Sequence, residues 1–338
     1  MRNSITFILL FLIFCFEALA EDQFIFNVSK IEILENGNKI VGIDRGIIES
    51  NSGIKIEADN FEYNKKNNIL NVNGNVIINY AEKNYTIYAE NISYLKNKNI
   101  IKAKNKIKFI DRKEKIITSN NFLLDITKNI FEAEGNVEII NLIKNYNLKS
   151  NNIIYFKNEE RIISKGLTNA LLNENYKFKS NQNLSIDLID FEIKASGEVE
   201  FIDFDKKNKI LTDEIYFYKD NEEIITEGKT EAKIENRFIL KSKNIFFSNK
   251  NRVIKSKNKA SINDIENDSY YEIDNFYLSL EDEILKGENI SANTEYSQPL
   301  NNKYFIKSGM FDLKNKSFLT QDISFHLKKD LFNNKKND

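Results

Sequence analysis

The 338-residue sequence has almost none of the residues that build metal centres, disulfides and histidine-dependent catalytic sites. It contains one cysteine, one histidine (His326), one proline (Pro299) and no tryptophan. A cysteine- or histidine-ligated metal site needs several such residues, and a catalytic triad needs a histidine placed beside its nucleophile. The sequence therefore predicts no metal, no cofactor and no enzymatic role.

An excess of either charge is also missing. Lysine and arginine total 49 against 50 aspartate and glutamate residues, and no stretch forms a basic domain, so we expect no nucleic-acid partner. The segment 227–230 ends like a nucleotide-binding loop, but Glu223 stands where that motif requires its first glycine. We therefore predict no nucleotide site.

Long apolar runs are confined to the first 20 residues. Arg2 precedes an apolar stretch over residues 5–16, and Ala18-Leu19-Ala20 fits a leader-peptidase site, so residues 1–20 are expected to be a signal peptide cleaved after Ala20. The stretch is too short for a stable membrane span, although an uncleaved anchor is the alternative. Cleavage would export the chain to the periplasm and remove Cys15, so the mature protein would have no disulfide.

What the sequence does contain is a repeat of 30 or 31 residues. Residues 56–63 (IEADNFEY) return as 87–94 (IYAENISY). With Asn60 as the first anchor, the equivalent residues are Asn91, Asn121, Asn152, Asn183, Glu214, Asn244 and Asn275. A less regular copy follows near Gly309, after a loop around Pro299.

Five positions after the anchor keep their chemistry from copy to copy. Positions one, three and ten residues later are always apolar or aromatic, as in Phe61, Tyr63 and Leu70. The position twelve residues later is small or valine, and glycine or asparagine stands fourteen residues later, as in Gly74 and Asn105. Such period-two spacing is typical of half-buried strands, and β-branched and aromatic residues fill the inward phase.

Each copy is therefore predicted to be two strands and two turns. Polar segments such as 64–68 and 95–99 join the strands as hairpins. The internal glycine or asparagine predicts a bulge, because both residues tolerate positive φ. Inward parity also switches between Ala58 and Phe61, as expected where a strand turns a corner between two sheets. One copy cannot bury enough surface alone, so the copies must stack.

The prediction is an all-β, elongated array of two-strand units over residues 21–327, followed by a polar tail over 328–338. The motif Ala58-Asp-Asn-Phe-Glu-Tyr63 followed by Gly74-Asn-Val-Ile-Ile78, with Gly135-Asn-Val-Glu-Ile139, resembles the OstA-like domains of lipopolysaccharide transport proteins. That family includes the periplasmic bridge protein LptA, the inner-membrane-anchored LptC and the N-terminal part of the outer-membrane assembly protein LptD. The resemblance covers nearly all of the mature chain and implies a twisted, V-shaped β-jellyroll that is open along one side.

Among family members, the tail from Phe325 to Asp338 is most similar to the segment before the LptD barrel. The barrel itself is missing from the sequence, so no membrane-inserted role follows. A piece of a longer protein, a truncated gene and a stand-alone LptA-like bridge protein all stay open. A β-solenoid enzyme acting on polysaccharide, or an adhesin, is the alternative from another class, but no copy is interrupted by residues that would form a catalytic site.

The resemblance implies a periplasmic conduit that binds lipopolysaccharide for its assembly at the outer membrane, where the protein itself would be attached. Its expected partners are other Lpt-type β-jellyroll proteins, joined by edge-strand pairing, and an outer-membrane barrel protein. The candidate lipid-binding groove residues are Phe61, Tyr63, Tyr94, Phe122, Tyr155, Phe217 and Phe247. The candidate partner-binding edge is the strand from Phe24 to Leu34, represented by Phe24, Phe26 and Val28.

Overall fold

The computed structural model describes residues 24–112, 114–297 and 302–326, without the side chains of 302 and 321–326. The expected signal peptide, Pro299 and the polar tail lie outside these residues. The described chain forms two compact units that divide after Ile117. No helix among the described residues is long and apolar enough to cross a membrane.

The chain is all-β, as the repeat predicts. The first unit contains β1 (Phe24–Asn27), β2 (Lys30–Leu34), β3 (Lys39–Ser50), β4 (Ile54–Asn64), β5 (Ile69–Tyr80), β6 (Tyr85–Leu95) and β7 (Ile100–Asp111). β8 (Lys115–Asp125) begins before the division and ends in the second unit. Three short 3-10 turns, η1 (Glu35–Gly37), η2 (Ala81–Lys83) and η3 (Lys96–Lys98), join strands of the first unit.

The second unit continues the same pattern. Its strands are β9 (Ile130–Asn141), β10 (Tyr146–Phe156), β11 (Arg161–Leu172), β12 (Tyr176–Ser180), β13 (Asn183–Asp187), β14 (Glu192–Asp203), β15 (Asn208–Tyr218), β16 (Glu223–Ile234), β17 (Phe238–Lys243), β18 (Phe246–Ser248), β19 (Val253–Ser256), β20 (Ala260–Asp264), β21 (Ser269–Ser279), β22 (Ile284–Thr294), β23 (Asn302–Asp312) and β24 (Ser317–His326). The 3-10 turn η4 (Lys157–Glu159) joins β10 to β11.

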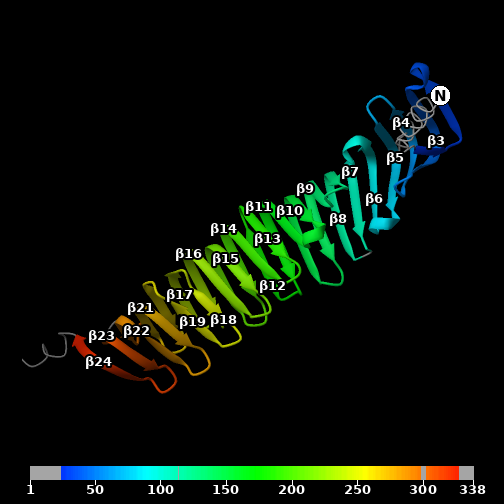
Figure 1. Cartoon of the computed structure of the whole chain (residues 1–338). Helices are drawn as coiled ribbons and strands as arrows, with labels where there is room; N and C mark the ends of the chain where they lie inside the picture. Colours follow the sequence, from blue (N-terminus) through cyan, green and yellow to red (C-terminus); the bar gives the residue numbers. More distant parts are fainter. Residues whose placement is uncertain (1–23, 113, 298–301, 327–338) are drawn as a thin grey trace, which may run out of the picture. The chain divides into compact units, whose positions relative to one another are not determined.

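The strand pairings are all antiparallel. β4 pairs with β3 and β5, and β15 pairs with β14 and β16, so successive hairpins share one hydrogen-bonded ladder. Within the second unit, the strands from β9 to β24 follow one another in chain order (Figure 1). Each hairpin therefore contacts mainly its neighbours in sequence, which is the arrangement that repeat proteins use to build a shared core.

The predicted corner lies in the middle of the strands. In β4, Ile54, Ile56 and Ala58 are buried, the next two residues are not, and burial resumes at Phe61 and Tyr63. Inward side chains thus change parity across the corner, and the two halves of the strand belong to two layers. Three of the first strands are interrupted at this point, between β1 and β2, between β12 and β13, and between β17 and β18.

A bulge at the corner accompanies the change of layer. Registers shift between the paired strands there, with one residue of β10 opposing two of β11. The extra residue takes positive φ at most of the predicted positions, namely Gly74, Asn105, Gly135, Gly166, Gly197, Gly228 and Asn289. Asn258, in the remaining regular copy, does not have positive φ, because the chain between β19 and β20 leaves the ladder at that point.

One repeat copy was not predicted. β1, β2 and β3 form a further two-strand unit before the first anchor, with β2 paired to the first half of β3 and β1 to the second half. Its signal is present in the sequence: Lys30 serves as the anchor, Ile31, Ile33 and Ile40 hold the apolar positions, and Asp44 has φ 68° where other copies place glycine or asparagine.

Candidate functional site: the interior between the two layers

All seven predicted groove residues lie in the interior between the layers. None is more than 8% exposed, and Tyr155 and Phe217 are 0% and 1% exposed. Phe61, Tyr63 and Tyr94 belong to the first unit, and the other four to the second. In the state described here these aromatic rings pack against protein, so a ligand would reach them only if the two layers separated.

Side chains from the two layers touch directly. In the second unit Phe217 projects from one layer and lies 4.9 Å from Tyr176 and 5.6 Å from Phe178, ring centre to ring centre, both of which project from the other layer. Phe201 completes this cluster at 5.6 Å from Phe217. The interior is therefore a packed apolar core at this level.

The candidate partner-binding edge begins the first unit. Phe24 and Phe26 face inward, where Phe24 lies 5.0 Å from the Tyr63 ring and Phe26 lies 6.0 Å from Phe61. Val28 is half-buried beside Gly46, where a Cβ atom would come within 2.4 Å of the valine side chain. Within the described residues, β1 and β2 pair only with β3, which leaves their other backbone edge without a partner strand.

The interior is less well covered at the outermost strands. In the first unit, Ile31 and Ile33 continue the inner columns of Phe61 and Tyr63, yet they are 42% and 65% exposed. In the second unit, Phe318 pairs with buried Phe311 and is 42% exposed. A cavity of about 310 Å³ opens beside it, lined by residues that include Tyr271, Tyr304, Phe311 and Phe318.

Opposite the corner, the hairpin turns of the second unit form two rows. The first lip comprises the turns at 142–145, 173–175, 204–207, 235–237 and 265–268, and the second lip the turns at 126–129, 157–160, 188–191, 219–222, 249–252, 280–283 and 313–316. Backbone hydrogen bonds join successive turns within each lip, for example Phe204 N–H to Asn175 O at 2.9 Å and Asn249 N–H to Glu222 O at 2.9 Å. We call the line between the two lips the mouth.

Side chains of the first lip reach across the mouth at regular intervals. Lys144 Nζ donates to Leu188 O at 2.6 Å, Lys206 Nζ to Asn249 O at 3.4 Å, and Asn267 Nδ2 to Leu313 O at 2.9 Å. These three residues are 62 and 61 residues apart, which is twice the length of one copy. The doubling arises because four-residue turns alternate with shorter ones along this lip.

A buried polar residue positions each of these turns. Asn141, Asp203 and Asp264 end the preceding strands, and their side-chain oxygens accept the backbone N–H of Lys144, Lys206 and Asn267 at 2.7, 3.0 and 3.3 Å. Burial raises the pKa of Asp203 above its ordinary value, although the hydrogen bond and the charge of Lys206 oppose that change.

Ion pairs fill the mouth between these contacts. Lys206 Nζ lies 2.8 Å from Glu222, and Arg252 makes two bonds to Glu235, at 2.8 and 3.1 Å. Arg237 bonds to the fully buried Asp264 through two nitrogens, both at 3.0 Å, and to Glu283 at 2.8 Å. Burial lowers the pKa of Arg237, but its hydrogen bonds to both carboxylates outweigh burial and raise the pKa above its ordinary value.

The corner of the second unit also holds polar side chains between the layers, but these are neutral. Thr230 contacts the hydroxyls of Thr212 at 3.0 Å and Thr226 at 2.9 Å. A matching set lies 62 residues earlier, where the Thr168 hydroxyl contacts those of Ser150 at 3.1 Å and Ser164 at 2.8 Å. Each set is buried and also bonds to backbone carbonyls such as Gly166 O and Glu227 O.

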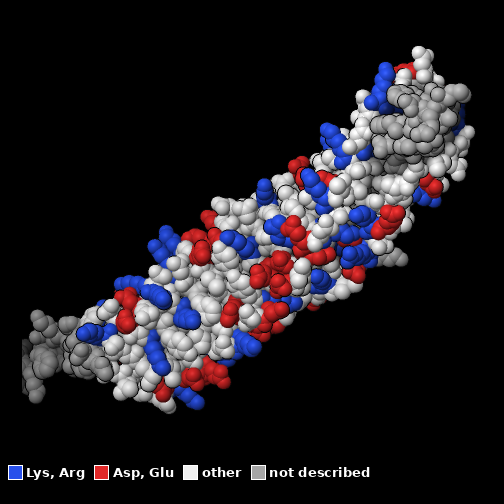
Figure 2. All heavy atoms as spheres, in the orientation of Figure 1, with Lys and Arg blue, Asp and Glu red and all other residues white. Residues whose placement is uncertain are grey.

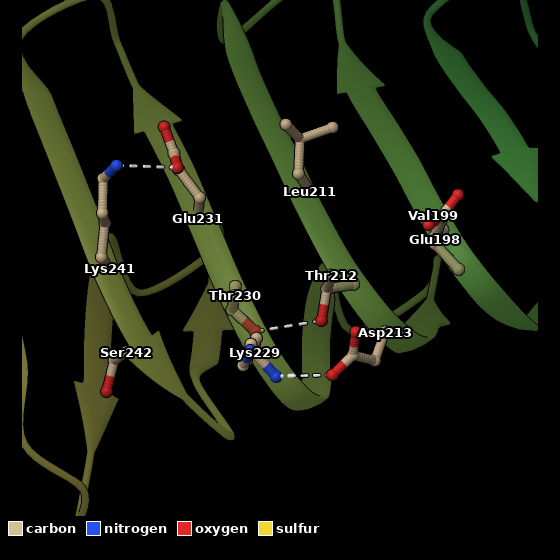
Figure 3. A pocket seen from close by; sticks show the side chains of 10 residues that line it. All are labelled: Glu198, Val199, Leu211, Thr212, Asp213, Lys229, Thr230, Glu231, Lys241 and Ser242. Carbon is tan, nitrogen blue, oxygen red and sulfur yellow. Dashed lines mark hydrogen bonds and ion pairs between the residues drawn. The ribbon is translucent and has the colours of Figure 1, made fainter.

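Outside this corner lies a hollow of about 510 Å³ (Figure 3). Its walls carry charges of both signs: Lys241 pairs with Glu231 at 3.0 Å, and Asp213 accepts the backbone N–H of Lys229 at 2.8 Å. Among the described residues, no cluster of three or more histidine, cysteine, aspartate or glutamate side chains is arranged to hold a metal ion.

The outward faces are polar and mixed in charge. Basic and acidic side chains are interspersed on the visible face, without a large area of one sign (Figure 2). Many form cross-strand pairs, such as Lys194 with Glu214 at 2.7 Å and Lys209 with Glu200 at 2.6 Å.

Comparison with the models of known protein families gives no match, and comparison with curated protein sequences gives none either.

Proposed function

We propose that this protein is a periplasmic, non-catalytic conduit that holds the acyl chains of lipopolysaccharide between its two layers. The observation that supports this most strongly is the interior itself, to which strand after strand contributes large apolar side chains in each unit. Burying an acyl chain there would contribute about 0.8 kcal/mol per methylene, enough to hold a lipid in an aqueous compartment. The saccharide part would remain in water outside the mouth.

The mouth is the proposed route for the acyl chains in the second unit. The corner is joined by continuous backbone and buried hydroxyls, whereas the lips are joined by long side chains. Separating the lips breaks a handful of side-chain contacts and leaves every strand ladder intact. Acyl chains would then replace contacts such as that between Phe217 and Tyr176.

The partners that we propose follow from the resemblance to OstA-like domains, within which we favour the N-terminal domain of LptD over a stand-alone LptA-like bridge. The unpaired backbone edge of β1 and β2 would accept a strand of another Lpt-type β-jellyroll protein, so that the two interiors join. Exposed Ile31 and Ile33 would then be covered. The β24 end would face an outer-membrane barrel protein.

Photocrosslinking from neighbouring positions on β15 tests the lipid-binding proposal. Phe217 points into the interior, and Tyr216 points outward, where it bonds to Lys194 and Glu214. With benzoylphenylalanine at either position and purified lipopolysaccharide as ligand, we expect capture at position 217 to exceed that at 216 by roughly tenfold or more, because only the inward position contacts buried acyl chains.

Equal capture at the two positions would contradict the proposal. Position 155 should behave like 217, since Tyr155 is also fully buried, and positions 65 and 96 in the turns of the first unit should behave like 216. The outward variants serve as controls for folding and for contact between lipid and protein surface.

A further inference from the structure

Two cations of the mouth stand over one crevice that leads into the interior. Lys206 comes from the first lip and Arg252 from the second, and both contact Asn249: the Lys206 ammonium bonds to its carbonyl oxygen at 3.4 Å, and so does the Arg252 backbone N–H at 3.4 Å. The crevice is lined by both cations, by Asn208 and Asn249, and below them by Ile234, Phe247, Ile254 and Leu280.

This crevice is closed in the structure. It holds about 10 Å³ of free space, no more than a single water molecule needs. Its polar rim is satisfied internally, because Lys206 pairs with Glu222 and Arg252 pairs with Glu235. The crevice is therefore charged at its rim and apolar at its floor, and the two regions are about one side-chain length apart.

Opening the mouth would break both ion pairs and expose the floor at once. Each pair joins one lip to the other: Lys206 and Glu235 belong to the first lip, and Glu222 and Arg252 to the second. A ligand that satisfies both cations and the floor must carry an anionic, oxygen-rich group directly above an alkyl chain. Phosphate fits this requirement, since arginine binds it through two parallel hydrogen bonds and lysine as a point charge.

We infer that Lys206 and Arg252 form a binding site for a phosphate group of the lipid headgroup, exchanging Glu222 and Glu235 for it when the mouth opens over Phe247. This inference rests on the proposed lipid-binding function and gives that function a headgroup specificity. A neutral amphiphile must break the same two ion pairs, but it carries no charged group that could pair with the released cations. Phosphate-bearing amphiphiles are therefore favoured.

The other cations of the mouth are less suited to this role. Arg237 is held by the buried Asp264 carboxylate, so releasing it would leave an unpaired charge in the core. Lys144 binds the neutral carbonyl of Leu188. By contrast, the side chains of Lys206 and Arg252 are 33% and 40% exposed. On opening, each loses a surface carboxylate, and Lys206 also loses the Asn249 carbonyl.

The two ion pairs provide matched variants for the test. Arg252→Gln and Glu235→Gln break the same contact, but only the first removes a cation, and the same holds for Lys206→Gln and Glu222→Gln. Binding of dodecyl phosphate and of an uncharged dodecyl glycoside, both below their micelle concentrations, would be measured on the exported protein and the four variants by titration calorimetry.

For dodecyl phosphate we expect affinity to fall several-fold in Arg252→Gln and Lys206→Gln, and to rise in Glu235→Gln and Glu222→Gln. For the glycoside all four variants should bind equally, and slightly more tightly than the wild type, because each loses one contact that holds the mouth closed. Arg252→Lys should retain part of the preference for phosphate. Circular dichroism verifies that each variant folds.

If all four variants change phosphate affinity in the same direction, or the wild type binds both amphiphiles alike, the phosphate site is wrong while the lipid-binding interior stands. If neither amphiphile binds the wild type or any variant, both the inference and the proposed function are overturned.

Discussion

The corner and the mouth of the second unit hold its two layers together by different chemistry. At the corner, short neutral side chains such as Thr226 and Thr230 are buried and bond to one another and to the backbone. At the mouth, long and partly exposed side chains such as Lys206 and Arg252 extend to carboxylates and carbonyls of the opposite lip. Exposed ion pairs contribute little stability, and unmade buried hydrogen bonds cost much more.

This difference indicates which side of the interior can open. Separating the layers at the corner would leave buried hydroxyls without hydrogen-bond partners and would break hydrogen bonds between paired strands. Separating them at the mouth returns charged groups to water. Most of the mouth is thus a weak closure opposite a strong hinge. Arg237 is the exception, because its partner Asp264 is fully buried.

The largest effect on stability is therefore expected at Arg237. Arg237→Gln should lower the free energy of unfolding by about 3–5 kcal/mol, because it leaves the buried Asp264 carboxylate without its bidentate partner. Arg252→Gln, which breaks an exposed pair in the same mouth, should cost less than about 1 kcal/mol. Urea denaturation measures both, and similar costs for the two variants would mean that the mouth does not divide into a structural and an openable part.

A smaller loss is expected at the corner. Thr230→Val preserves shape but removes the hydroxyl that bonds to both Thr212 and Thr226, and should cost about 1–3 kcal/mol. Ser185→Ala, on the outward side of β13, should change stability by less than about 0.5 kcal/mol. A corner variant as harmless as Ser185→Ala would show that the hydroxyl set does not strengthen the hinge.

Two glycines of the corner bulges separate backbone strain from crowding. Gly166 and Gly228 both have φ near +80°, so alanine should cost about 1–2 kcal/mol at either position. A Cβ at Gly166 meets nothing within 4 Å, whereas one at Gly228 would come within 2.2 Å of the Asp213 carboxylate. In thermal denaturation, Gly228→Ala should therefore have a lower melting temperature than Gly166→Ala. The reverse order would contradict the bulge geometry.

The smallest effect concerns pH. Because the folded-state pKa of Asp203 is raised, the protonated carboxyl is favoured in the fold, and its stabilising contribution is lost as pH rises from the ordinary value of 3.8 through the raised one. Asp203→Asn, which copies Asn141 in the equivalent turn, should be more stable than the wild type at pH 7, with the gap closing in acid. Melting of the wild type and the variant, followed against pH, measures this gap.

The sequence predicts much of this fold because each copy repeats the same demands. Phe61, Tyr63 and Leu70 mark inward positions, and the glycine or asparagine of the bulge marks the corner. The copy from β1 to β3 was not predicted because its anchor is Lys30 and its bulge residue is Asp44, in place of the usual asparagine or glycine. Asparagine abundance, which sequence composition alone leaves unexplained, is partly structural: Asn68, Asn84, Asn99, Asn129 and Asn145 all end turns with positive φ.

The contacts of the mouth could not be predicted from the sequence, for a physical reason. The contacts of Lys144, Lys206 and Asn267 with backbone carbonyls of the opposite lip join residues 43 to 46 positions apart on different hairpins, and a single-copy period does not bring them into register. The signal exists only at the doubled period of 61 or 62 residues, in Lys144, Lys206 and Asn267. Whether the predicted groove residues contact lipid likewise depends on the mouth opening, which no local pattern encodes.

The most direct test of the central claim is to lock the mouth. A reducible bis-maleimide would join cysteines in the double variant Lys206→Cys/Glu222→Cys, which spans the two lips, and in the control Asn175→Cys/Asp205→Cys, which joins adjacent turns of one lip where Asn175 and Asp205 lie 2.6 Å apart. Lipopolysaccharide capture would be measured with benzoylphenylalanine at position 217. The lock across the lips should abolish capture until it is reduced, while the lock along one lip should leave capture unchanged; undiminished capture with the lips joined would contradict access through the mouth.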